Sequence, residues 1–279
     1  MSDRRTLETG TEDLVGEVVG PVAVLAFNRP ERRNALSESM YGGFARALPA
    51  VAQDPSIRVL LVTGRGGAFC AGGDVKGFNE RNQAFAAGAS PPPAEDAISD
   101  LRARQRQVSL ALHQLPKPVV AALPGPAAGA GLSIALSADL RLAAERALLV
   151  TAFVDIGASG DFGGSWFLTQ LVGPSKAKEL YMTSPRLTAS EAERLGIVNR
   201  VLPDDGFDDA ALAFCQELAS RAPIALRYIK ENVNRALVAD LSTALDAEAA
   251  AMNRTMSTAD HREAAAAFVE KRTATFTGR

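Results

Sequence analysis

The chain has few of the side chains on which many protein sites depend. Its 279 residues include only two histidines, His113 and His261, and two cysteines, Cys70 and Cys215. So few histidines limit the scope for zinc sites and for histidine-based catalysis. The cysteines lie far apart and form no Cys-x-x-Cys motif, so we expect no disulfide framework. A reducing cytoplasm is the expected compartment.

An excess of charge of one sign is also missing. The sequence holds 30 basic and 32 acidic residues, which gives a formal net charge of −2. Without a basic excess or a polybasic tract, the sequence indicates neither nucleic acid nor an anionic membrane as a partner. Apolar runs are broken by Gly, Pro or charge before they reach membrane-spanning length, and residues 1–15 lack the apolar core of a signal peptide.

Strands and helices are predicted to alternate over the first 205 residues. Two short strands within residues 14–28 flank a Gly20–Pro21 turn, and Ser37 is placed to cap a helix that ends near Asp54. Apolar, β-branched runs at residues 59–64 and 118–123 predict buried strands. This alternation predicts an α/β core over residues 1–205.

Two later segments depart from this alternation. Residues 79–96 are rich in Ala, Pro and polar residues with weak periodicity, which predicts a mobile loop that covers a site; a helix is expected from about residue 98 to 115. Residues 206–279 show consecutive Ala- and Leu-rich helical patterns. We expect an all-helical part with little core of its own, which packs on another copy of the chain.

Glycine gathers in two turns, each directly after an apolar strand. The first reads GRGGAFCAGGDV over residues 64–75, and the second reads GPAAGAG over residues 125–131. Phe69 breaks a G-x-G-x-x-G pattern and no Gly-Lys-Ser/Thr occurs, so nucleotide binding is not favoured. Two readings remain: glycine for tight packing, or backbone amides of both turns that converge on one carbonyl oxygen.

Six motifs in the same order resemble those of the crotonase superfamily, the enoyl-CoA hydratase/isomerase family. They are NRPERRNALS (28–37), GRGGAFCAGGDVK (64–76), GPAAGAGLSIALSADLRLA (125–143), GDFGGSWFLTQLVG (160–173), LTASEAERLGIVNRVLP (187–203) and FVEKRTATF (268–276). The resemblance implies a crotonase-like spiral core of repeated ββα turns over residues 1–205 and a helical trimerisation domain over 206–279. It also implies a homotrimer or a dimer of trimers.

The resemblance implies an acyl-CoA thioester as substrate, with no cofactor beyond its coenzyme A moiety and no metal. The amides of Ala71 and Ala130 match the positions that bind the thioester oxygen in an oxyanion hole. Residues that match the family's coenzyme A contacts are Arg32, Arg33, Ala68, Ala71, Asp74, Val75, Phe268 and Lys271. Cys70, beside a donor, is more readily explained by small-residue packing than by nucleophilic chemistry.

The acids that face the thioester decide the reaction in this family. Hydratases carry two glutamates, and the matching positions here are Ser133 and Phe153. Asp161 stands where relatives that isomerise unsaturated acyl-CoA place a catalytic aspartate. We therefore expect double-bond isomerisation with Asp161 as acid and base, its pKa raised by neighbours such as Phe162 and Trp166.

Other readings stay open at this point. Asp161 could instead cap the helix that follows it. Hydration by Asp161 with an unforeseen second acid is the main alternative reaction, and a non-catalytic acyl-CoA-binding subunit is a further one. Gly131 to Ala135 approximates a G-x-S-x-G nucleophile elbow around Ser133, but the strand that should precede such a serine directly is missing.

Overall fold

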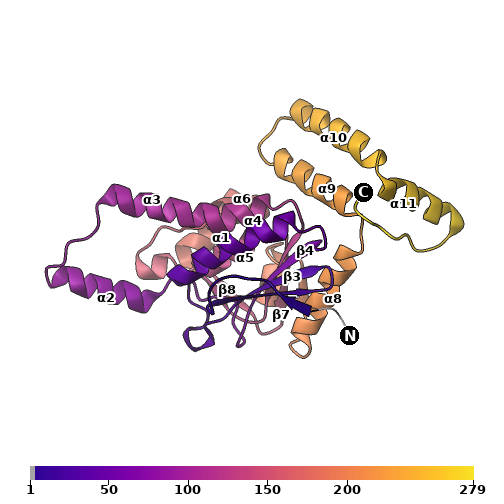
Figure 1. The fold of residues 1–279 in the computed structure, drawn as a ribbon. Coiled ribbons are helices and arrows are strands. Elements are labelled where there is room, and N and C mark those ends of the chain that lie inside the picture. The colour runs from indigo at the N-terminus through magenta and orange to yellow at the C-terminus, as the bar shows by residue number, and fades with distance from the viewer. Residues whose placement is uncertain (1–3) are drawn as a thin grey trace.

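The computed structural model of the protein describes residues 4–279 (Figure 1), so the first three residues of the expected 1–205 core lie outside it. A seven-stranded sheet runs in the order β1-β2-β3-β4-β5-β7-β10. The first three strands pair antiparallel and the others parallel. The strands are β1 (Arg4–Thr6), β2 (Leu14–Val19), β3 (Val22–Phe27), β4 (Val59–Gly64), β5 (Val119–Leu123), β7 (Leu140–Ala144) and β10 (Arg200–Leu202).

The strands expected from apolar, β-branched runs are all present. The Gly20–Pro21 turn joins β2 to β3 in a hairpin, and Gly20 adopts φ 57°, a conformation that glycine reaches without strain. A small second sheet continues from the turn after β5. It comprises β6 (Ala127–Ala128), β8 (Leu148–Val150) and β9 (Leu187–Thr188).

Helices cover both faces of the main sheet. On one face, α1 (Glu38–Gln53) and α5 (Ala130–Leu136) share the larger apolar core, and the predicted cap Ser37 accepts a hydrogen bond from the Met40 amide. On the other face, α8 (Phe207–Ala219) buries Phe207 and Cys215 against the strands. The first helix beyond residue 205 therefore packs on the sheet.

The expected loop over residues 79–96 is largely helical, which corrects that prediction. The helices α2 (Val75–Ala86) and α3 (Ala94–Gln105) leave only residues 87–93 irregular. Figure 1 shows both helices extending from one side of the core. Their side chains are mostly exposed, so no apolar face imposes a strong periodicity on the sequence. The helix continues through η2 (Arg106–Leu110), a π-helix, and α4 (Ala111–Gln114).

Three helices project from the core at the other end of the molecule in Figure 1: α9 (Pro223–Ala236), α10 (Leu241–Met256) and α11 (Ala259–Glu270). They expose large apolar side chains, among them Ile229, Val233 and Phe268. The remaining elements are η1 (Pro30–Arg32), η3 (Val154–Ile156), α6 (Gly164–Thr183) and α7 (Ala189–Arg194). Across residues 4–279, no helix combines the length and apolar character needed to cross a bilayer.

Candidate active site

The two glycine-rich turns lie against each other. Cys70 and Ala127 form an isolated parallel bridge, and the Ala128 amide donates to the Cys70 carbonyl at 2.9 Å. A Cβ at Gly131 would overlap the Cys70 carbonyl oxygen, and one at Gly125 would overlap the Gly67 carbonyl oxygen. Several of the glycines thus serve close backbone packing, which brings the peptide groups of both turns to one place.

The amide of Ala71 is not available to a ligand, which corrects its assignment as an oxyanion donor. It donates to the Arg33 carbonyl at 3.0 Å, while the Gly72 amide points to the Cys70 sulfur at 3.4 Å. Within residues 4–279 the next amide, that of Gly73, has no protein acceptor. The structure therefore indicates Gly73 as the available donor of the first turn.

Ala130 supplies the corresponding amide of the second turn. It is the first residue of α5, where amides have no acceptor inside the helix. A Cβ built on Gly72 would lie 3.2 Å from the Ala130 nitrogen and 2.7 Å from the Ala128 oxygen. Gly72 has φ 88°, so its backbone turns sharply just before Gly73. The geometry brings the amides of Gly73 and Ala130 to neighbouring positions.

Asp161 lies in the turn that leads into α6. Its Oδ1 is buried without a hydrogen-bond partner in the described chain, and burial raises the pKa of its carboxyl to about 6. The N-cap of α6 is Gly163, with no side-chain cap, so the capping explanation for Asp161 is wrong. A half-buried carboxyl with an unpaired oxygen and a pKa near neutrality suits proton transfer.

The surroundings of Asp161 connect it to the second glycine turn and to α1. Its carbonyl accepts from the Gly164 amide at 3.1 Å, and Gly164 packs directly on Ser133, which is one turn along α5 from Ala130. Burial raises the pKa of Tyr41 to about 12. The Tyr41 ring stacks on that of Phe162, the residue after Asp161, with centroids 5.8 Å apart, so α1 also borders this turn.

The two positions that match hydratase glutamates hold no acid and are closed to water. Ser133 is 1% exposed, and its hydroxyl donates to the Gly129 carbonyl at 3.3 Å. Phe153 is buried and stacks on Tyr181, with ring centroids 6.0 Å apart and an interplanar angle of 6°. Neither side chain can move a proton to or from a substrate carbon.

Two nucleophile hypotheses are not supported by the geometry. Cys70 is fully buried, and burial raises the pKa of its thiol to about 12, so it stays protonated at neutral pH. Ser133 lies within α5 rather than at the end of a strand, and His261 lies on α11. A nucleophile elbow with a serine, histidine and aspartate is therefore not assembled.

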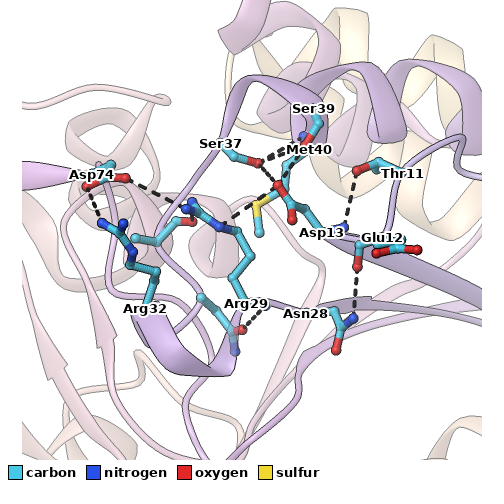
Figure 2. Close-up of polar contacts among 12 residues, drawn as sticks. Thr11, Glu12, Asp13, Asn28, Arg29, Arg32, Ser37, Ser39, Met40 and Asp74 are labelled. Atoms are coloured by element: carbon cyan, nitrogen blue, oxygen red, sulfur yellow. Dashed lines mark hydrogen bonds and ion pairs between the residues drawn. The ribbon is translucent and has the colours of Figure 1, made fainter. Parts of the chain in front are cut away.

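A polar network connects residues 28–37 to the first turn (Figure 2). The Arg29 guanidinium lies 3.8 Å from Asp74 and 3.9 Å from Asp13, and that of Arg32 lies 3.8 Å from Asp74. The Asn34 side chain, fully buried, donates to the Ala68 carbonyl at 2.8 Å. Arg29 and Asn34 both belong to the NRPERRNALS motif, but the sequence alone did not predict their contacts with the first turn.

The residues matched to coenzyme A contacts fall into two groups. Arg32, Arg33 and the first-turn positions Ala68, Asp74 and Val75 lie together, with Asp74 accepting from the Gly77 amide at the start of α2. Phe268 and Lys271 lie at the end of α11, and Figure 1 shows α11 and α2 on opposite sides of the molecule. A single chain does not bring the two groups together.

Comparison with known proteins shows which family and which solved structures this chain is similar to. The family model described as enoyl-CoA hydratase/isomerase matches residues 17–279. The 1,2-epoxyphenylacetyl-CoA isomerase of Escherichia coli K12 is 36% identical over 96% of this chain and 99% of its own length. The short-chain-enoyl-CoA hydratase of Clostridium acetobutylicum is 33% identical over 93% and 95%. The crystal structure of an enoyl-CoA hydratase from Polaromonas sp. JS666 superposes with a TM-score of 0.86 at 35% identity, covering 94% of this chain and 99% of that one.

Proposed function

The chain belongs to the enoyl-CoA hydratase/isomerase family, and we propose that its reaction is isomerisation of a β,γ-unsaturated acyl-CoA thioester. Its relatives are named both isomerase and hydratase, so it is an enzyme of that type. The observation that carries isomerisation is the half-buried Asp161 carboxyl, whose Oδ1 is buried without a hydrogen-bond partner in the described chain and whose pKa is raised by burial to about 6.

The proposed reaction needs one acid–base group. The Asp161 carboxylate takes a proton from C2 of the thioester, and the electron pair moves onto the carbonyl oxygen. The amides of Gly73 and Ala130 stabilise this enolate; each such donor typically contributes about 10²–10³ in rate. The protonated carboxyl then delivers the proton to C4. The double bond moves from C3=C4 to C2=C3, and no atom is gained or lost.

Hydration is the alternative within the family. Adding water across C2=C3 needs one group to activate the water and a proton donor for C2. Ser133 and Phe153 occupy the two positions that hold glutamates in hydratases. Asp161 therefore has no second acid at either position, which favours isomerisation. A non-catalytic acyl-CoA-binding subunit is a further alternative, and the raised pKa of Asp161 speaks against it because a binder needs no tuned carboxyl.

Coenzyme A is proposed to bind along the first turn. Arg32 is 43% exposed at its side chain and holds Asp74 only loosely at 3.8 Å, so its guanidinium can turn to a phosphate. Arg33 lies beside it, and the backbone at Ala68, Asp74 and Val75 borders the same surface. Phe268 and Lys271 would then reach coenzyme A from a neighbouring copy of the chain.

Self-association belongs to the same proposal. Isolated helices α9 to α11 expose apolar side chains that cost free energy in water, and burial between copies would offset that cost. In the proposed trimer, or dimer of trimers, α11 of one copy would lie near the first turn of another. This would complete the coenzyme A site that one chain leaves divided.

The test compares Asp161→Asn with wild type on 3-hexenoyl-CoA. We expect wild type to give 2-hexenoyl-CoA of unchanged mass, and the variant to lose at least 10²-fold in kcat. Asp155→Asn is the matched control, because Asp155 is an exposed neighbour whose carboxylate accepts from Ser184 at 2.8 Å. Full turnover by Asp161→Asn, or a product heavier by one water, would refute isomerisation by this residue.

A further inference from the structure

The direction of the Gly73 amide is set by the peptide group to which it belongs. The Gly72 carbonyl accepts a hydrogen bond from the Leu36 amide at 2.8 Å. Within residues 4–279 the peptide bonds are trans, so the Gly72 carbonyl and the Gly73 N–H, which share one peptide plane, point in opposite directions. The bond from Leu36 therefore turns the Gly73 N–H away from residues 33–36.

The same segment also holds the preceding residue of the first turn. The Ala71 amide donates to the Arg33 carbonyl at 3.0 Å, so residues 33–36 bond the turn on both sides of the Gly72 Cα. A peptide between two glycines has the widest choice of backbone angles and would otherwise rotate easily. The two hydrogen bonds therefore restrict the one peptide group of this turn that carries the available donor.

Asn34 fixes residues 33–36 against the first turn. It is fully buried and has φ 59°, a conformation that asparagine adopts more readily than most residues. Its Nδ2 donates to the Arg65 carbonyl at 2.9 Å and to the Ala68 carbonyl at 2.8 Å, and its Oδ1 accepts from the Arg29 amide at 2.8 Å. One side chain thus closes the loop that begins at Arg29 and joins it to the start of the turn.

These contacts connect the turn to the end of a central strand. Arg65 follows β4 directly, and its amide donates to the carbonyl of Phe27, the last residue of β3, at 2.9 Å. A Cβ on Gly64, the last residue of β4, would lie 2.8 Å from the Asn34 Nδ2, so glycine leaves room for the asparagine. Asn34 thereby ties residues 33–36 to the main sheet, which is the rigid part of the fold.

Resting on the proposed function, we propose that Asn34 is a positioning residue for the oxyanion site. Because it is fully buried, it does not touch the substrate. It holds residues 33–36 in place, and the Leu36 amide then directs the Gly73 N–H to the thioester oxygen. Donors that are held in advance stabilise an enolate well because they need not reorient as the charge develops. Without Asn34 the peptide before Gly73 would rotate, and this donor would be lost for part of the time.

The test observes the thioester carbonyl in the Asp161→Asn protein, where no turnover interferes. 3-Hexenoyl-CoA with a ¹³C-labelled carbonyl is bound, and isotope-edited infrared spectroscopy measures its C=O stretching frequency, which falls as the oxygen accepts stronger hydrogen bonds. We expect a downshift on binding. Adding Asn34→Ala should remove about half of it, since Ala130 remains as the second donor. Adding Asn199→Ala, which removes another asparagine bond to the backbone (Arg141 amide, 2.8 Å), should leave the downshift unchanged.

A second variant keeps every side chain and decides the question even where Asn34→Ala does not fold. Replacing the Leu36 amide by an ester, through incorporation of the corresponding α-hydroxy acid, deletes only the hydrogen bond to the Gly72 carbonyl. It should reduce the downshift in the same way. In the enzyme that retains Asp161, the ester should lower kcat at least about tenfold, towards the 10²–10³ that a whole donor contributes.

The outcomes separate this inference from the proposed function. The frequency of the band, unlike its height, does not depend on the fraction of folded protein. An unchanged frequency in Asn34→Ala or in the Leu36 ester would overturn the positioning role and leave isomerisation standing. An equal loss in Asn199→Ala would also overturn it, because general destabilisation would then be the cause. A bound ester without any downshift in the Asp161→Asn parent would refute the oxyanion site itself, and the positioning role with it.

Discussion

The ring of Phe162 stacks on that of Tyr41, with centroids 5.8 Å apart and an interplanar angle of 15°. Phe162 holds this position at φ 48°, a conformation that a bulky residue adopts only under constraint from its surroundings. The stack fixes an apolar ring directly after Asp161, whose carboxyl is partly shielded from water. The raised pKa of Asp161 is thus a consequence of packing in this turn.

The activity of the enzyme should depend on pH through this carboxyl. Because the base must be ionised, we expect kcat/KM on 3-hexenoyl-CoA to fall as the pH drops through about 6. Phe162→Gly removes the ring and accepts the positive φ without strain. In this variant water reaches the carboxyl, its pKa falls towards 3.8, and the acid limb should move to lower pH.

Phe162→Leu is the control for that experiment, since it keeps apolar bulk beside Asp161. Its acid limb should stay close to that of wild type, and circular dichroism should show both variants folded. An acid limb that does not move in Phe162→Gly would mean that this ring does not desolvate Asp161.

The ionised Asp161 carboxylate should lower the free energy of unfolding at neutral pH. Its pKa is 3.8 when unfolded and about 6 when folded, so the folded state binds more protons between these values and stability falls as pH rises through them. Asp161→Asn does not titrate, and we expect it to be more stable at about pH 7.5, by at most roughly 3 kcal/mol at 1.36 kcal/mol per pKa unit. The gain, measured by urea unfolding, should vanish near pH 4. A pH-independent difference would contradict this linkage.

The two glycine turns should tolerate a methyl group at one glycine and not at another. Gly67 and Gly72 have similar positive φ values, 81° and 88°, so alanine strains both backbones alike. A Cβ at Gly67 meets nothing within 4 Å, whereas one at Gly72 lies 2.7 Å from the Ala128 oxygen. We expect Gly72→Ala to lose at least 10²-fold in kcat while Gly67→Ala keeps most activity. Equal losses would point to backbone strain alone.

The exposed apolar side chains of α9 should be buried between copies of the chain. Ile229 and Val233 are 58% and 60% exposed, and Val233→Glu would place a charge in any interface formed there. Light scattering at micromolar concentration should give a multiple of the 29.3 kDa chain mass for wild type and a smaller mass for the variant. Met182→Glu, at a 70% exposed position on α6, should leave the mass unchanged. A wild-type monomer would refute the assembly.

Local patterns in the sequence predicted most of the fold. Apolar runs gave β3, β4 and β5, and Ser37 marked the start of α1, because each signal depends on neighbours within a few residues. The prediction of a loop over residues 79–96 was wrong because it, too, depended on local patterns alone. α2 and α3 bury almost nothing, so their sequences carry no helical stripe to detect.

For the site, the sequence by itself determined which side chains are present: Asp161 as the remaining acid, and Ser133 and Phe153 where two acids would stand. Only the tertiary structure decided which backbone amide is free. The Ala71 amide is used by the Arg33 carbonyl, 38 residues away along the chain, and Gly73 is left available. A peptide N–H is the same at every non-proline position, so its availability depends on partners that folding brings near.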